Sequence, residues 1–210
     1  MRIIKKPAER KAEILDAAEA LFATKGYVKT SVADILDAVG IAKGTFYYHF
    51  KSKEEVMDSV VMRFVGAGIE SAQSIAKDSK LTATEKLFQL ITSGSANESH
   101  KEHLIEQLHE TNNAEMHLKS LVETILGLAP ILADIIHQGV EEKSFSTPYP
   151  RESAEFLLVS SQFLLDAGLF HWKPEEIKQK TKAFSYLMET TLGAKSGTFN
   201  YVYERLSNNK

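Results

Sequence analysis

The fold is decided by one stretch near the N-terminus, residues 30–56, which reads TSVADILDAVGIAKGTFYYHFKSKEEV. Its first part carries apolar residues three and four positions apart, which predicts a helix that begins after a Thr30–Ser31 cap and ends at Gly40. These apolar residues are Val32, Ile35, Leu36 and Val39. A short aromatic helix is expected next. A helix, a glycine-containing turn and a short helix over residues 31–50 have the spacing of a helix-turn-helix.

The aromatic run at 46–50 makes sense if the two sides of its short helix differ. Phe46 and Phe50 are separated by only about 40° around the helix axis, so both can anchor it to neighbouring helices. The opposite side carries Gly44, Thr45, Tyr47 and Tyr48, with Lys43 at the N-terminal tip and His49 on a flank. Hydroxyls and ring edges on that side suit DNA phosphates and base edges. The alternative is a small helical core whose tyrosines are merely exposed.

The rest of the chain also has helical periodicity, and no alternation long enough for a sheet is present. The predicted class is therefore all-α. Pro130 is expected to kink or divide the long helix in which it falls. The expected helices outside the opening stretch are 8–25, a long helix capped by Ser52 and Glu55, one from Thr82, a short one over 99–109, and 113–142, 152–170 and 174–192.

Composition limits the kind of protein and the kind of partner. Hydrophobic residues make up 43% and charged residues 25%, as in folded proteins, and cysteine is absent, which excludes disulfides and thiolate metal sites. Residues 1–53 hold ten Lys/Arg against six Asp/Glu, a net of +4, whereas the remainder has a net of -7. A basic head suggests a polyanion partner. We expect no signal peptide, no membrane span and a cytoplasmic location.

Metal and catalytic chemistry are both disfavoured by the sequence. His100 and His103 lie three positions apart near Glu106, with His109 and His117 nearby, but a metal sensor needs three or four ligands converging on one ion. A polar, solvent-facing helix explains this segment better. No GxSxG, HExxH or phosphate-loop pattern is present. We therefore predict no metal site, no cofactor and no enzymatic activity.

Residues 8–60 resemble the DNA-binding segment of the tetracycline-repressor-like (TetR) family of bacterial transcriptional regulators. The resemblance is carried by Gly26, Thr30-Ser31-Val32, Asp34-Ile35, Val39-Gly40, the run Lys43 to Phe50 and Lys51-Ser52-Lys53-Glu54-Glu55. It implies a three-helix DNA-binding domain over residues 1–53 and a helical ligand-binding and dimerisation domain over 54–210. It also implies a dimeric repressor that a small-molecule inducer releases from a palindromic operator in double-stranded DNA.

The same resemblance assigns roles to individual side chains. Residues implied to face bases are Lys43, Gly44, Thr45 and Tyr47. Residues implied to hold phosphates are Thr30, Ser31, Tyr48, His49 and Lys53. Many relatives carry a long polar residue at the position of Ala33, which cannot reach a base. Sequence readout is therefore expected to depend almost wholly on the short aromatic helix.

A second copy of the chain is expected because one helix-turn-helix reads about half a site. By resemblance, the last two long helices pair with those of the partner in a four-helix bundle. The predicted interface residues are Phe156, Ser160, Phe163, Phe184, Leu187 and Met188. The alternative is that the apolar residues of these two helices face the protomer's own core. An inducer pocket is expected within residues 82–142, without identified lining residues. A protein of another class, a helical binding module with a vestigial DNA-binding head, is also left open.

Overall fold

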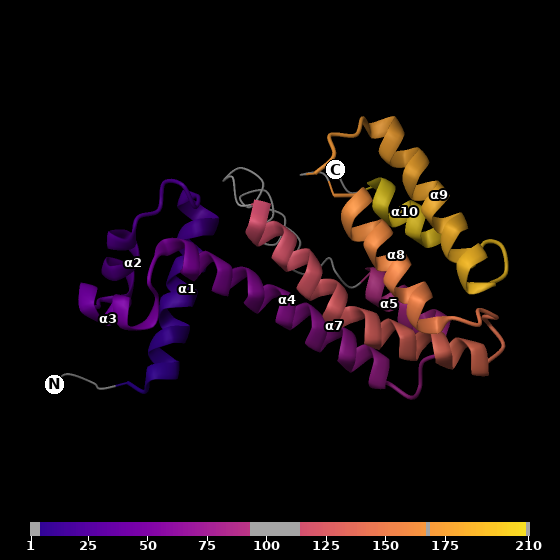
Figure 1. Cartoon of the computed structure of the whole chain (residues 1–210), viewed down its shortest axis with the longest axis horizontal. Coiled ribbons are helices and arrows are strands. Elements are labelled where there is room, and N and C mark those ends of the chain that lie inside the picture. Colours follow the sequence, from indigo (N-terminus) through magenta and orange to yellow (C-terminus); the bar gives the residue numbers. More distant parts are fainter. Residues whose placement is uncertain (1–4, 93–113, 167–168, 209–210) are drawn as a thin grey trace. The chain divides into compact units, whose positions relative to one another are not determined.

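A computed structural model describes residues 5–92, 114–166 and 169–208, and these residues form helices and no strand. The all-α class predicted from the sequence is confirmed. In chain order (Figure 1), the helices are α1 (Pro7–Lys25), α2 (Val32–Val39), α3 (Lys43–His49), α4 (Lys53–Lys77), α5 (Ala83–Thr92), α7 (Ala114–Glu141), α8 (Pro150–Leu164), α9 (Pro174–Leu192) and α10 (Asn200–Asn208).

The described residues separate into two compact units. The first contains residues 5–66 and 114–120, and the second contains 67–92, 121–166 and 169–208. Helices α4 and α7 each contribute residues to both units. The start of α4 belongs to the first unit because Val56, Met57 and Val60 are fully buried in its core, whereas the predicted domain boundary lies at the first residue of α4.

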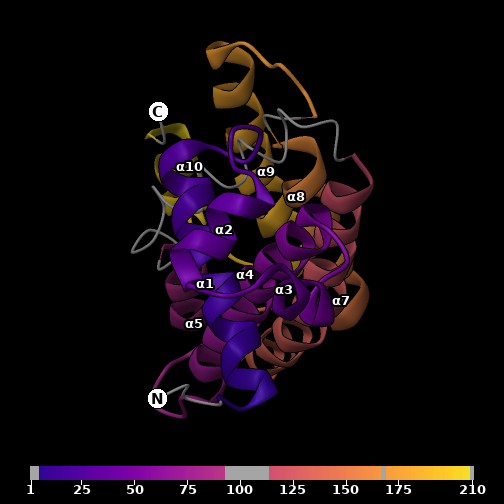
Figure 2. The same ribbon diagram turned by 90° about the vertical axis from the view of Figure 1, so that its left-hand side faces the viewer.

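The first unit is a small helical core around α1, α2, α3 and the start of α4, which are labelled in Figure 2. Helix α1 places Ile14, Ala18 and Phe22 into this core at helical spacing. Phe46 and Phe50 are 0% and 1% exposed, so the prediction that they anchor the short helix is confirmed. A helix of two turns cannot hold itself in water, and this burial is what fixes α3.

The second unit is built on α5, α8, α9, α10 and the larger part of α7. Helix α10 packs on α9 and α5, burying Val202 with the preceding Phe199. The sequence did not predict α10. The buried Phe199 and Val202, three positions apart, form too short an apolar pattern to stand out in the sequence.

Two other helices differ from the sequence prediction. Helix α7 continues through Pro130, so of the two predicted outcomes, a kink or a division, the division is wrong. A proline removes one backbone hydrogen bond, and the long apolar stripe of α7 buries enough on either side to keep one helix. Helix α8 ends at Leu164, with Leu165 as its C-cap, rather than near residue 170. The helix predicted over 99–109 lies outside the described residues.

Helix α7 is also apolar over a length that was not expected. Among the described residues, Glu115–Glu141 is the one segment long and apolar enough to cross a membrane, with a mean hydropathy of 1.5 over its best window. A third of that window is buried inside the protein, at 33%. Core helices pass the same test of length and composition, so this feature alone is weak evidence for a membrane span.

Candidate nucleic-acid interface

Helix α2 is held by a local cap at each end. The Asp34 N–H donates to the Ser31 hydroxyl at 3.2 Å, and the Ser31 N–H donates to the Asp34 carboxylate at 2.7 Å, which completes a capping box. The Lys25 ammonium lies 2.7 Å from that carboxylate, and together with the Ser31 donors it holds the pKa of Asp34 well below its usual range. Gly40 ends the helix in the left-handed region, at φ 69°.

The turn before α2 directs one predicted contact inward. Thr30 is 1% exposed, and its hydroxyl donates to the Gly26 carbonyl at 2.7 Å. Ser31, its neighbour, is exposed. The predicted phosphate contact of the Thr30 side chain is untested, but a hydroxyl buried and bonded in this way has little surface to offer a ligand.

Helix α3 presents two tyrosines to solvent beside its buried phenylalanine. Tyr47 is 47% exposed and Tyr48 is 75% exposed, while Phe46 is fully buried. The Tyr47 ring meets the Phe46 ring edge-on at a centroid distance of 5.3 Å, which restricts where Tyr47 points. The Lys43 ammonium lies 5.9 Å from the Tyr47 ring centroid, and the Tyr48 and His49 rings are 4.9 Å apart. The structure therefore gathers the predicted α3 residues into one aromatic and basic face.

Gly44 has no internal reason to be glycine. Its φ is not positive, and a Cβ built at this position would meet nothing within 4 Å. Glycine in a helix costs roughly 0.5–1 kcal/mol relative to alanine. Because this glycine destabilises the helix without being needed by the fold, we expect it to serve a partner, for example by letting another molecule approach the backbone closely.

Three lysines lie close to α3. Lys43 and Lys51, at the two ends of α3, are exposed. The sequence analysis did not identify Lys11 of α1, whose ammonium lies 5.3 Å from the Phe50 ring centroid. The sequence did indicate that Lys11 lies on the side of α1 that packs in the core. It precedes the buried Ile14 by one helical turn and the buried Ala18 by two.

Lys53, also predicted to hold a phosphate, has other partners in the structure. Its ammonium donates to the backbone carbonyls of Tyr27 and Thr30, both at 2.8 Å. The side chain is partly buried. Its predicted phosphate contact is untested.

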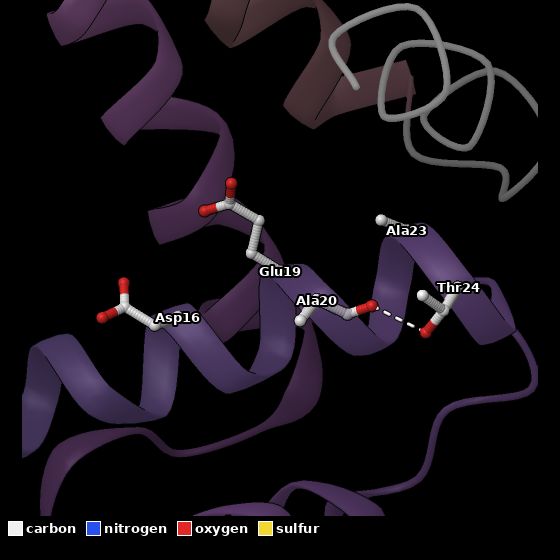
Figure 3. A pocket seen from close by; sticks show the side chains of 5 residues that line it. All are labelled: Asp16, Glu19, Ala20, Ala23 and Thr24. Carbon is white, nitrogen blue, oxygen red and sulfur yellow. Dashed lines mark hydrogen bonds between the residues drawn. The ribbon is translucent and has the colours of Figure 1, made fainter. Parts of the chain in front are cut away.

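A small pocket on the side of α1 does not fit a DNA-binding role. It is lined by Asp16, Glu19, Ala20, Ala23 and Thr24 (Figure 3). Arg63 of α4 bonds Asp16 at 2.6 Å and also pairs with Glu19, so the two carboxylates serve to join α1 to α4. Carboxylates would repel phosphates, and we assign no ligand to this pocket.

The second unit carries an exposed apolar surface on α8 and α9, which pack together. Of the predicted interface residues, Phe156, Phe163 and Leu187 are 70%, 43% and 43% exposed. Ser160 and Phe184 are partly buried. Met188 is only 5% exposed and packs in the protomer's own core, so it has little surface left to bury. Exposed apolar residues of α8 and α9 outside the predicted interface set are Val159, Leu164 and Tyr186.

The other predicted features fall mainly outside the described residues. His100, His103 and His109 lie in the undescribed segment 93–113, as does part of the region expected to enclose an inducer. His117 is buried, at 8% exposed. Among the described residues, no three histidines or carboxylates are grouped closely enough to hold a metal ion.

Comparisons with known proteins agree with this geometry. Residues 14–60 match the family described as "Bacterial regulatory proteins, tetR family", and residues 95–187 match "Tetracyclin repressor-like, C-terminal domain". The "HTH-type transcriptional repressor KstR2" of Mycolicibacterium smegmatis is 32% identical over 142 residues, covering 66% of this chain and 69% of that protein. The "Fatty acid metabolism regulator protein" of Bacillus subtilis is 32% identical over 132 residues, covering 61% and 67%.

The fold is also found among solved structures. Salmonella enterica GusR aligns with 91% of this chain and 99% of its own, with a TM-score of 0.64 and 16% identity. At this identity the likeness concerns the arrangement of the helices. It extends over both units of the chain.

Proposed function

Because the chain belongs to the tetR family of bacterial regulatory proteins and is a DNA-binding transcriptional regulator, we propose that it acts as a cytoplasmic, homodimeric repressor. Two copies bind a palindromic operator, and a small molecule bound in the C-terminal unit releases them. The inducer acts through its different affinities for the DNA-bound and free arrangements. We expect no cofactor and no enzymatic activity.

The observation that carries this proposal is the division of α3 into two sides. Phe46 and Phe50 are buried, whereas Tyr47 and Tyr48 are exposed between cations. A short helix after a turn, with its outer side aromatic and basic, fits the major groove. The glycine at position 44 leaves room for close approach to the duplex.

The side chains divide into base readers and phosphate contacts. Thymine methyls accept apolar contacts, and phosphates accept hydrogen bonds from hydroxyl and ring N–H donors, so residue type suggests the role. We propose Lys43, Gly44, Thr45 and Tyr47 as base-facing residues. We propose Ser31, Tyr48, His49 and, beyond the sequence prediction, Lys11 and Lys51 as phosphate contacts. Thr30 is left out because its hydroxyl is buried and bonded within the protein.

Operator binding that weakens steeply with salt is the direct test of this function. Lys11 and Lys51 from two protomers give about four ionic contacts with phosphates, which predict a roughly 150-fold loss of affinity between about 50 and 200 mM salt. Footprinting and gel shifts on the DNA upstream of the gene measure this, with scrambled DNA as the control. Absence of a specific footprint at any salt concentration would favour the helical binding module with a vestigial head.

Dimerisation through α8 and α9 predicts that Phe156→Glu produces a monomer. Phe156 is 70% exposed, so glutamate costs the isolated protomer little, but in a paired bundle the charge would be buried without a partner. The molar mass measured by light scattering at micromolar concentration is expected to fall from twice 23.4 kDa for the unaltered protein to 23.4 kDa for the variant. Tyr149→Glu, at an equally exposed site just before α8, is the control and should remain dimeric. A dimeric Phe156→Glu protein would contradict this interface.

A further inference from the structure

The ammonium group of Lys53 is occupied inside the first unit. It donates to the carbonyls of Tyr27 and Thr30, both at 2.8 Å, and lies 4.2 Å from the centroid of the Tyr27 ring. A lysine ammonium has three N–H donors. Two are used by carbonyls, and the ring lies close enough for a cation–π contact. Lys53 therefore has at most one N–H left for a phosphate.

The turn that Lys53 binds lies directly before α2. Residues 27–30 are closed by the Thr30 N–H, which donates to the carbonyls of Gly26 and Tyr27 at 3.1 and 3.2 Å. Tyr27 is 7% exposed, and its hydroxyl donates to Glu54 at 3.4 Å. Burial and the nearby Glu54 carboxylate raise the pKa of the Tyr27 phenol to about 12. Two consecutive residues of α4 therefore hold this turn.

The next residue, Ser31, is the N-cap of α2. A displacement of the turn would move the start of α2, and Ile35 of α2 packs in the same core as Phe46 of α3. The position of α3, which carries the proposed base readers, thus depends on where the turn is fixed. A cation that binds two carbonyls at once defines that place more tightly than apolar packing alone.

We propose that Lys53 is a positioning residue, which fixes turn 27–30 to the start of α4 and so sets the helix-turn-helix for its operator, without contacting phosphate. This inference rests on the proposed function and gives the residue a different role from the phosphate contact implied by resemblance. The exposed lysines proposed to hold phosphates are Lys11 and Lys51.

Salt dependence separates positioning from phosphate contact. Each lost ionic contact reduces the slope of log affinity against log salt by about 0.9, hence by about 1.8 for a dimer. Lys51→Met, at an exposed lysine two positions away, should show that reduction. Lys53→Met is expected to lower operator affinity by at least about tenfold with the slope unchanged, and to leave affinity for scrambled DNA at matched salt as it was. A slope reduced by about 1.8, or wild-type operator affinity, would overturn the proposal.

A second measurement needs no variant, in case Lys53→Met does not fold. In ¹⁵N spectra selective for lysine ammonium groups, the free, unaltered protein should show a Lys53 signal protected from solvent exchange, unlike that of Lys51. The signal should persist on the operator. Rapid exchange in the free protein, or a change on binding that marks a phosphate contact, would refute the role. If the unaltered protein binds no operator, the proposed function fails, while the free-protein signal still reports on Lys53.

Discussion

Tyr47→Ala is expected to abolish specific operator binding while the fold is retained. Tyr47 is 47% exposed and contributes little to the core, so removing its ring should change the free energy of unfolding by less than about 1 kcal/mol. A lost base contact costs about 1–3 kcal/mol. A dimer loses two of them, which predicts a loss of at least about 30-fold. This brings operator affinity towards that for non-specific DNA.

Footprinting at fixed salt measures this effect, and circular dichroism verifies the fold. The matched control is Tyr48→Ala, one residue away and 75% exposed. Because Tyr48 is proposed to contact a phosphate, its loss should weaken binding to the operator and binding to scrambled DNA to a similar degree. An unchanged footprint with Tyr47→Ala would remove Tyr47 from the set of base readers.

Phe46→Ala, at the neighbouring position, is expected to disrupt the fold, which Tyr47→Ala leaves intact. Phe46 is 0% exposed and lies at the centre of the first core, between the stripes of α1 and α2. Truncating a fully buried phenylalanine costs about 3–5 kcal/mol. Since α3 has only two turns and is held by this ring, we expect the loss of α3 and with it the loss of specific operator binding.

Hydrogen exchange is the measurement suited to Phe46→Ala. Amides of α1, α2 and α3 should lose protection in the variant. Phe88→Ala provides the comparison, because Phe88 lies on α5 in the second unit and is 46% exposed. It should leave the amides of the first unit as protected as in the unaltered chain. Full protection of α3 in Phe46→Ala would mean that another contact anchors the helix.

The helices of the first unit were predictable because their signals are local. The bounds of α2 follow from Ser31 with Asp34 at its start and Gly40 at its end, and the structure shows both caps. The sides of α3 follow from the angle between Phe46 and Phe50. Capping and helical periodicity involve residues within four positions of each other, which a sequence displays directly. The resemblance to TetR regulators depends on this same segment.

The roles of several polar and apolar side chains could not be predicted in this way. Lys53 binds carbonyls that lie 23 and 26 positions earlier in the chain. Leu187 and Met188 belong to the same predicted apolar pattern of α9. Met188 nevertheless packs in the core, while Leu187 is 43% exposed. Periodicity defines a stripe, but its edge is decided by which neighbouring helices cover it. The uninterrupted course of α7 through Pro130 depends on tertiary packing for the same reason.

The sequence by itself determined the helical class, the helix-turn-helix and the two-sided character of α3, since each depends on residue type at short spacing. Only the tertiary structure decided which of those residues have side chains left to meet DNA. Thr30 and Lys53 have the residue types of phosphate contacts, and the folded chain uses both to close its own turn. The reason is that the fold buries Thr30 and brings Lys53 within hydrogen-bond distance of carbonyls 23 and 26 positions earlier, and neither effect is visible in the local sequence.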